Sequence, residues 1–259
     1  MRTIAVANQK GGCGKTTTAI NMAAAFARSG ARTLLIDLDP QGHATLGLGR
    51  APDRLEKSVY EVLTDPQVSL SAASISSNEE NVSLVPSNIL LSGVELKLAS
   101  VQQREYILDR KLSDMNGGYD VCVIDCAPSL SLLVLTALVA CNEVIIPVQA
   151  HYYAIEGLRQ LLETISIVKE RFNHNLNVLG ILLTFMEQKT LLSRQVEEQM
   201  RQLFGQMVFN TVIRKSVRLS EAPGAGKSIF AYAPKSNGAG EYQKLVKEIV
   251  NGREQIRTS

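Results

Sequence analysis

The chain has 259 residues, of which 45% are hydrophobic and 20% are charged. This composition excludes a disordered or fibrous chain, and the length predicts one domain over residues 1–259 with a core of its own. The longest apolar run, Leu130 to Ala140, is too short to span a bilayer, so we expect a cytoplasmic protein.

The formal net charge is only +2, but it is unevenly distributed along the chain. Residues 210–259 hold nine Lys and Arg against four Asp and Glu, whereas residues 1–209 hold eighteen against twenty-one. This asymmetry indicates an anionic partner for the C-terminal part, and a solvated surface with scattered lysines explains it about equally well.

The four cysteines show no paired metal spacing apart from Cys122 and Cys126, which lie in a predicted buried strand, so we expect free thiols.

Short apolar runs rich in β-branched residues alternate with segments of helical periodicity. This pattern predicts an α/β fold with a mostly parallel, twisted sheet of about seven or eight strands and helices on both faces. The predicted strands are Thr3 to Asn8, Thr33 to Leu38, Val82 to Pro86, Val121 to Asp125, Glu143 to Val148, Val178 to Thr184 and Val208 to Ile213.

Two later helices carry apolar stripes that we interpret as core faces. One helix, Ile155 to Arg171, has Leu158, Leu161, Leu162, Ile165 and Val168 on one face; the other has a stripe of Leu192, Val196, Met200 and Leu203. The polar stretch Ser69 to Asn81 is predicted to be a variable excursion.

The first strand is followed by "QKGGCGK", Gln9 to Lys15, and then by an alanine-rich helical sequence that stops at Gly30. Strand, glycine-rich turn and helix come in the order of a phosphate-binding loop, in which glycines at 11, 12 and 14 let backbone N–H groups point at one anion. The nucleotide-binding residues predicted here are Gly11, Gly12, Cys13, Gly14, Lys15, Thr16 and Thr17. Lys15 can neutralise phosphate oxygens, and the Thr16 hydroxyl is placed to ligate Mg²⁺. Gln9 departs from the glycine of the general pattern, and a tight strand-to-helix turn is the alternative interpretation.

Carboxylates stand at the ends of two later strands. Asp37 and Asp39 lie in "TLLIDLDPQG", and Asp125 lies in "YDVCVIDCAPS". Residues at the carboxyl ends of an open parallel sheet face the crevice where ligands bind. We therefore predict that Thr16, Asp37 and Asp125 form a magnesium site and that Asp39 orients a water for attack on a γ phosphate. Any one of these aspartates alone would be explained as a cap or turn residue.

The loop "KGGCGKTT", with "DLDPQG" and "YDVCVIDCAPS", resembles the deviant Walker A ATPases. The stretch "VRLSEAPGAGKSIF", Val217 to Phe230, is similar to their ParA/Soj branch, which moves plasmids and chromosomes. The resemblance runs from Thr3 to about Val250 and implies a P-loop NTPase that binds ATP and Mg²⁺ as a homodimer. It also implies slow hydrolysis that a ParB-like partner stimulates, with Lys10, Lys15 and Asp39 as catalytic residues. Lys10 would be the signature lysine that reaches the phosphates bound by the other subunit.

In this branch, a basic surface of the ATP dimer binds double-stranded DNA without sequence preference, which implies a nucleoid-associated protein. The matching positions are Lys189 and Arg218, to which Arg214 and Lys215 could add phosphate contacts. The family usually reads "IPRN" where this chain has "IRKS", Ile213 to Ser216, so Arg214 replaces a proline that commonly lies near the adenine. A second glycine stretch, "GAGKS" from Gly224 to Ser228, lacks a preceding strand and is predicted to be a basic surface loop.

Three other interpretations use the same loop. A MinD-like membrane-associated ATPase would need bulky apolar anchors in a C-terminal helix, but no Trp or Phe occurs near the end of this chain, so we predict a helix packed on the domain and no membrane partner. An iron–sulfur reductase is indicated only by Cys126, since a second cysteine is missing between residues 86 and 120. A ParA-like ATPase that positions a protein cargo on the nucleoid stays open, because the cargo is chosen by a partner.

Overall fold

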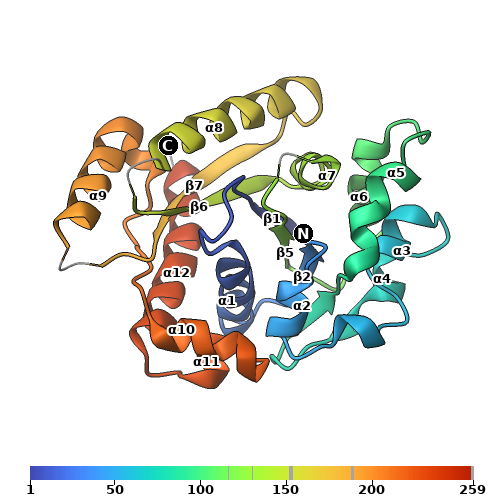
Figure 1. Ribbon diagram of the computed structural model, residues 1–259, viewed down its shortest axis with the longest axis horizontal. Helices are drawn as coiled ribbons and strands as arrows, with labels where there is room; N and C mark the ends of the chain where they lie inside the picture. The colour runs from blue at the N-terminus through green and yellow to red at the C-terminus, as the bar shows by residue number, and fades with distance from the viewer. Residues whose placement is uncertain (116, 130, 152–153, 188–189, 258–259) are drawn as a thin grey trace.

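The computed structural model describes residues 1–115, 117–129, 131–151, 154–187 and 190–257. Its centre is a seven-stranded sheet in the order β3-β4-β2-β5-β1-β6-β7 (Figure 1). All neighbouring strands are parallel except β3, which runs antiparallel to β4. The strands are β1 Arg2–Val6, β2 Thr33–Leu38, β3 Ile75–Ser76, β4 Val82–Val85, β5 Val121–Cys126, β6 Glu143–Gln149 and β7 Asn177–Thr184.

Helices precede and follow these strands along the chain. The α-helices are α1 Lys15–Arg28, α2 His43–Gly47, α3 Val59–Thr64, α4 Leu70–Ala73, α5 Val94–Lys97, α6 Ile107–Ser113, α7 Leu132–Ala140, α8 Ala154–Arg171, α9 Leu191–Phe204, α10 Val217–Glu221, α11 Ile229–Tyr232 and α12 Asn237–Arg257. The short 3-10 helices are η1 Pro52–Arg54, η2 Ile89–Gly93, η3 Arg104–Tyr106, η4 Gly205–Met207 and η5 Ala222–Ala225.

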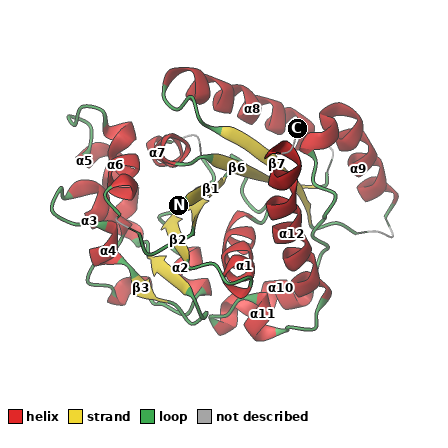
Figure 2. Ribbon diagram, turned by 180° about the vertical axis from the view of Figure 1, so that it is seen from behind, coloured by secondary structure: helices red, strands yellow, loops and turns green. Residues whose placement is uncertain are grey.

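The two faces of the sheet are buried in separate cores, because alternate residues of a strand point to opposite faces. On β1, Ile4 and Val6 belong to the core that α1 and α12 cover, whereas Ala5 belongs to the core covered by α7 and α8. Figures 1 and 2 show α12 beside α1 on one side of the sheet and α7 and α8 on the other. The prediction of an α/β fold with a mostly parallel sheet and helices on both faces is confirmed.

Six of the seven predicted strands are present, but the prediction of a strand over Val208 to Ile213 is wrong. This segment runs beside β7 and forms one isolated bridge to it, between Val208 and Ile181; a second bridge, between Arg214 and Met186, lies just beyond both segments. The reason is that a side chain of α12 binds the backbone of this segment. The carboxylate of Glu248 accepts hydrogen bonds from the N–H groups of residues 210 and 211, at 2.6 and 2.9 Å. Donors bound in this way are not available to a regular strand ladder.

The stripe predicted for α9 is only partly a core face. Val196 and Met200 are buried, but Leu192 and Leu203 are each 51% exposed. α9 lies on the side of the molecule where the sheet ends at β7, its edge strand, and only Val196 and Met200 of the stripe reach the core (Figure 1). In α8, by contrast, Leu158, Leu161, Ile165 and Val168 are all buried as predicted, and Leu162 is half-buried.

The predicted excursion over residues 69–81 contains α4 and the short edge strand β3, which the sequence pattern did not indicate. It is docked rather than free, because Glu79 accepts the N–H of Ser228 at 2.7 Å and Asn78 donates to the carbonyl of Gly226 at 3.3 Å. The "GAGKS" stretch is a loop that ends at the N-terminus of α11. The side chain of Ser228 caps this helix by accepting the N–H groups of Phe230 and Ala231.

The C-terminal helix α12 packs on the domain, as predicted. Leu245, Val246 and Ile249 are buried, and the hydroxyl of Tyr242 lies 3.3 Å from that of Thr18 on α1. In the part of the chain that the structure describes, no helix combines the length and the apolar character needed to span a membrane.

Candidate functional site

The predicted site residues converge because β1, β2 and β5 are neighbours in the sheet. Asp125 on β5 is paired in register with Val6 on one side and with Asp37 on the other. The loop that leaves β1 and the carboxylates that end β2 and β5 therefore share one edge of the sheet. This is the edge at which open α/β sheets bind ligands.

The glycine-rich loop has the backbone that the sequence predicts for a phosphate cradle. Gly12 and Gly14 have φ angles of 72° and 87°, a left-handed region that favours glycine. α1 begins at Lys15 with no side chain capping its N-terminus, so the free N–H groups of its first turn face the loop. The loop and the start of α1 together form an anion-binding surface.

The two lysines of the loop differ sharply in their surroundings. Lys15 is buried, and its ammonium group donates to the carbonyl of Lys10 at 2.9 Å. The Lys10 side chain is exposed, and its ammonium group has no partner among the described residues. One cation is therefore held inside the loop and the other is exposed to solvent.

Three polar residues that the sequence reasoning did not single out hold this loop in place. Asn8 accepts the N–H of Lys10 at 3.0 Å and donates to the carbonyl of Pro147 at 2.7 Å. Thr184, at the end of β7, donates to the carbonyl of Cys13 at 2.8 Å. Gln9, noted only as a departure from the motif, donates to the carbonyl of Gly157 on α8 at 3.0 Å. A polar residue at the end of a buried strand was the signal that could have found Asn8 and Thr184.

Asp37 is fully buried and both of its carboxylate oxygens accept hydrogen bonds. One oxygen accepts the N–H and the hydroxyl of Thr45 at 2.8 and 2.7 Å, and the other accepts the N–H of Asp39 at 3.2 Å. Burial raises the pKa of Asp37 to about 6, while the hydrogen bonds from Thr45 act in the opposite direction.

Asp125 is equally buried but differently surrounded. Neither of its carboxylate oxygens has a hydrogen-bond partner within the described ranges. Burial and the nearby charge of Asp37 raise its pKa well above the usual range, and the nearby Thr16 hydroxyl lowers it by a smaller amount. Two unpartnered, buried oxygen ligands beside a threonine hydroxyl fit a hard divalent cation such as Mg²⁺.

Asp39, the third predicted carboxylate, is 7% exposed and lies in the turn that follows β2. Its carboxylate accepts the N–H of Gln41 at 3.0 Å, and its carbonyl accepts the N–H of Gly42 at 2.9 Å. The structure therefore brings Asp37, Asp39 and Asp125 to the loop edge, as the sequence predicts.

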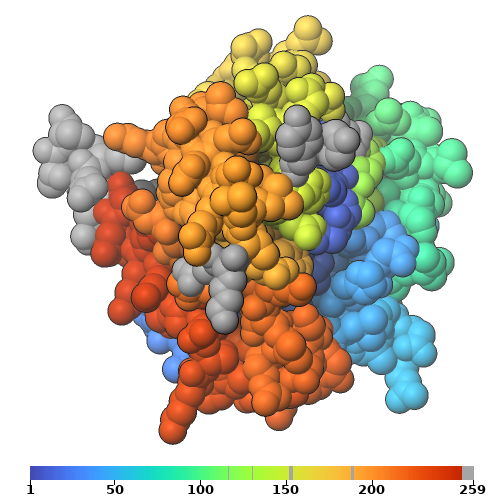
Figure 3. All heavy atoms as spheres, turned by 60° about the vertical axis from the view of Figure 1, so that its left-hand side comes forward, coloured from blue at the N-terminus to red at the C-terminus, as the bar shows by residue number. Residues whose placement is uncertain are grey.

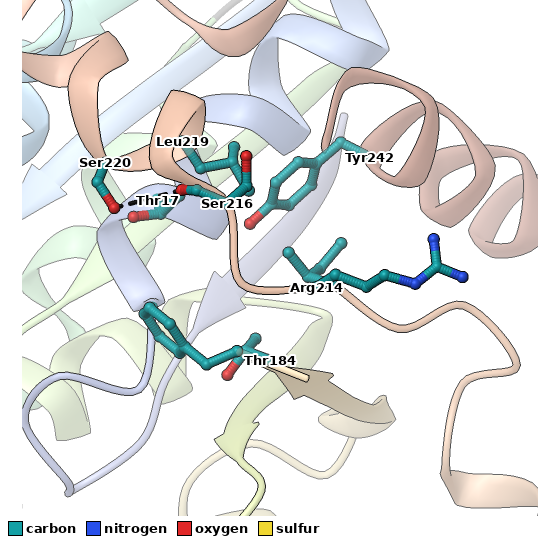
Figure 4. A pocket seen from close by; sticks show the side chains of 10 residues that line it. Thr17, Thr184, Arg214, Ser216, Leu219, Ser220 and Tyr242 are labelled. Carbon is teal, nitrogen blue, oxygen red and sulfur yellow. Dashed lines mark hydrogen bonds between the residues drawn. The ribbon is translucent and has the colours of Figure 1, made fainter. Parts of the chain in front are cut away.

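A pocket opens beside the loop, between α1 and the C-terminal segment (Figure 4). It is lined by small hydroxyl-bearing and apolar side chains, among them Thr17, Thr184, Phe185, Ser216, Leu219, Ser220 and Tyr242. Phe185 has a left-handed φ of 52°, rare for a bulky residue, and a Cβ added at Gly14 would lie 3.3 Å from its ring. Gly14 thus allows the ring to lie on the phosphate loop.

Arg214 lines the same pocket, but its guanidinium extends away from the other labelled side chains (Figure 4). It forms an ion pair with Glu241 on α12 at 2.9 Å, and its backbone N–H donates to the same carboxylate at 3.0 Å. Burial raises the pKa of Glu241, and the contacts with Arg214 oppose that shift. Arg214, at the position where the resemblance led us to expect a proline, is thus anchored to α12.

The other predicted DNA-binding cations are also paired. Lys215 contacts Glu187 at 3.0 Å, and Arg218 contacts Glu221 at 3.0 Å. Both cations lie in the last third of the chain, which covers much of the face seen in Figure 3. Lys189 lies outside the described residues. The described cations of this group therefore each have a carboxylate partner within the chain.

The fold and the site define a nucleotide-binding α/β protein of the phosphate-loop class, and the family model described as an AAA domain matches residues 1–178. The sporulation initiation inhibitor protein Soj of Bacillus subtilis is 45% identical over 246 residues, 95% of this chain and 97% of that protein. The chromosome-partitioning ATPase Soj of Thermus thermophilus is 47% identical over 252 residues, 96% of each chain. A solved structure, cobyrinic acid a,c-diamide synthase from Mycobacterium smegmatis with bound ATP analog and magnesium, aligns with a TM-score of 0.87 and 38% identity over 98% of this chain and 96% of that one. The chain belongs to the ParA/Soj family.

Proposed function

We propose that this chain is an ATP-dependent switch for chromosome or plasmid partition. The observation that carries the proposal is the meeting of the phosphate loop with Asp39 and Asp125 at one edge of the sheet. The Soj relatives, which are more similar to this chain than the diamide synthase is, support partition as the process that the switch serves.

In this proposal ATP is the substrate, and the loop residues 11–17 hold its phosphates. Lys15 leaves the carbonyl of Lys10 and neutralises phosphate oxygens, while the pocket beside Gly14 receives the base. The apolar and hydroxyl-bearing lining of that pocket suits a planar purine.

Thr16 and Asp125 would hold Mg²⁺, with Asp37 behind them because its oxygens already accept hydrogen bonds. When bound, Mg²⁺ neutralises the charge on the β and γ phosphates. Asp39 orients the attacking water and accepts its proton. Lys10 supplies a cation to the site of a second subunit, a role that the exposure of its side chain supports.

The ATP-bound homodimer then binds double-stranded DNA without sequence preference through Lys189, Arg214, Lys215 and Arg218, and a ParB-like partner accelerates hydrolysis and so releases it. The test is molecular size and DNA retention with ADP, with ATP, and with ATP on the Asp39→Ala variant. We expect a monomer with ADP, a dimer retained on DNA with ATP, and a dimer that persists in the variant. A protein that stays monomeric and ignores duplex DNA in all three conditions contradicts the proposal.

The DNA surface is tested separately with Arg218→Glu, which should abolish DNA retention and leave the ATP-dependent dimer intact. Arg32→Glu is the matched control, because Arg32 has nearly the same side-chain exposure, 60% against 61%, and is also paired with one carboxylate. Loss of both dimer and DNA retention in the Arg218 variant would mark Arg218 as structural. Binding of ATP-loaded protein to anionic vesicles but not to DNA would favour the membrane-associated alternative.

A further inference from the structure

Thr45 is a fully buried residue of α2 that is hydrogen-bonded to the site through Asp37, and within the described chain it forms no hydrogen bond to the predicted phosphate-binding residues. Its N–H and its hydroxyl both donate to the same carboxylate oxygen of Asp37, at 2.8 and 2.7 Å. Its hydroxyl oxygen also accepts the N–H of Ser87, at 2.9 Å. A threonine hydroxyl has one proton, so these partners fix its direction: the proton points to Asp37 and a lone pair to Ser87.

Together with a bond from Asp39, these bonds join both ends of the segment from Asp39 to Thr45 to the carboxylate of Asp37. At the start of this segment, the N–H of Asp39 donates to one oxygen of Asp37, and at its end the hydroxyl of Thr45 donates to the other oxygen. Between these two points the N–H of Gly42 donates to the carbonyl of Asp39 at 2.9 Å. The carboxylate of Asp37 therefore holds both ends of the segment that carries Asp39.

The hydrogen bond from the N–H of Ser87 to Thr45 links the segment from Asp39 to Thr45 to the sheet. Ser87 follows β4, which is the neighbour of β2 on the side away from β5. Like Thr45, Ser87 is fully buried. Removal of the Thr45 hydroxyl would leave the buried N–H of Ser87 without its acceptor and would take a charge-assisted hydrogen bond from Asp37.

We propose that Thr45 is a positioning residue for the reaction: its hydroxyl ties the segment Asp39–Gly42 to Asp37 and to the end of β4, and so holds Asp39 where it acts on the attacking water. This inference rests on the proposed ATPase function. It predicts an effect on the rate of hydrolysis rather than on nucleotide affinity, because the described hydrogen bonds of the Thr45 hydroxyl go to Asp37 and Ser87 and not to the phosphate loop or Lys15. A displacement of about 1 Å in a catalytic group is enough to lower a rate by about 10²-fold.

The test compares Thr45→Val, which keeps the shape of the side chain, with Thr45→Ser, which keeps the hydroxyl. Thr33→Val is the matched control, because Thr33 is equally buried at the other end of β2 and its hydroxyl donates only to the carbonyl of Ala31. We expect kcat for ATP hydrolysis to fall at least tenfold in Thr45→Val, with KM and the nucleotide Kd within threefold of wild type. Thr45→Ser and Thr33→Val should stay within threefold of wild type in kcat.

Thr45→Ala is examined alongside, because it cannot overfill the site. Amide hydrogen exchange should accelerate over residues 39–46 in this variant and remain unchanged over the phosphate loop, residues 9–16. Wild-type kcat and wild-type exchange in the Val and Ala variants would overturn the inference, as would a serine variant no more active than the valine one. A wild-type protein that does not hydrolyse ATP would instead refute the proposed function.

Discussion

The strand-end region around Asp37 and Asp125 and the C-terminal segment that carries Lys215 and Arg218 hold their charged groups in opposite ways. At the strand ends, Asp37 and Asp125 are fully buried and their main chain is fixed by the ladders of a parallel sheet. In the C-terminal segment, Lys215 and Arg218 are 67% and 61% exposed, and each is neutralised by one glutamate.

The two regions differ in how much free energy is needed to change the state of their charged groups. A buried carboxylate without a partner is destabilising in the folded chain, and a bound cation removes that penalty, so the strand-end site is arranged for a ligand. An exposed ion pair contributes only about 0–1 kcal/mol, so either glutamate could be exchanged for a phosphate of the proposed DNA partner with little loss of stability. The first region is suited to chemistry and the second to reversible contact.

The largest expected effect comes from Lys10, the exposed cation at the boundary of the strand-end region. Lys10→Ala should lower ATP hydrolysis by about 10³-fold, because a cation delivered from a second subunit acts on the transition state. ATP binding should stay near wild type, since Lys15 and the glycines remain. The measurement is ATPase activity and nucleotide affinity, with Lys169→Ala as an exposed-lysine control at the far end of α8.

Mixing experiments sharpen this prediction. A mixture of Lys10→Ala and Asp39→Ala subunits can form a heterodimer in which one site has an intact Asp39 and receives Lys10 from the other subunit. We expect the mixture to recover activity that neither variant has alone. Full activity of Lys10→Ala by itself, or no recovery in the mixture, would contradict a role across the interface.

The second effect concerns stability and pH. Burial raises the pKa of Asp125 in the folded chain above its unfolded value of about 4. The protonated folded form is therefore favoured, and the stability it contributes is present below about pH 4 and is lost as the pH rises through the folded pKa. Asp125→Asn should be more stable than wild type at pH 8, by on the order of 2 kcal/mol without nucleotide and Mg²⁺, and equally stable near pH 4.

Urea unfolding at several pH values measures this difference. Asp120→Asn is the control of opposite sign, because the hydrogen bond from Arg32 lowers the pKa of the exposed Asp120, so its loss should slightly destabilise the protein at pH 8. If Asp125→Asn is less stable than wild type at pH 8, then the charged carboxylate of Asp125 stabilises the fold even without a bound ligand, which contradicts this prediction.

A smaller effect tests how the C-terminal segment is held. Glu248→Ala removes the carboxylate that accepts the N–H groups of residues 210 and 211, and should lower the free energy of unfolding by about 1 kcal/mol. Glu198→Ala, at an exposed position on α9, should change it very little. Equal urea midpoints for the two variants would mean that the bridges to β7 suffice to hold the segment.

The smallest effect concerns the ion pairs of the proposed DNA surface. Glu221→Gln removes the partner of Arg218 and should strengthen duplex DNA binding of the ATP-loaded protein by about threefold, because phosphates no longer compete with the carboxylate. Asp120→Asn removes the same charge from a similar Arg pair elsewhere and serves as the control. An equal rise in both variants would assign the effect to net charge alone.

The strand-end region could be predicted from the sequence because its signals are local. Apolar runs predicted β1, β2, β4, β5, β6 and β7, and parallel pairing then brought their carboxyl ends to one edge. The C-terminal region could not be predicted in the same way. Its strand-like run at Val208 to Ile213 is held by Glu248, which lies 37 and 38 residues after the two backbone N–H groups that it accepts. Leu203 was predicted to be buried because a periodic stripe does not show how wide the contact of the helix with the core is.

The sequence by itself determined the class of this protein, the phosphate loop and the positions of its carboxylates, because strand, glycine turn and helix are written in adjacent residues. Only the tertiary structure decided which carboxylate oxygens accept hydrogen bonds: Asp37 accepts them from Thr45, while the oxygens of Asp125 have no hydrogen-bond partner in the described chain. It also decided that Arg214 and Arg218 are paired with carboxylates. Hydrogen bonds and ion pairs depend on distances of a few ångströms between side chains, and the folded arrangement sets those distances.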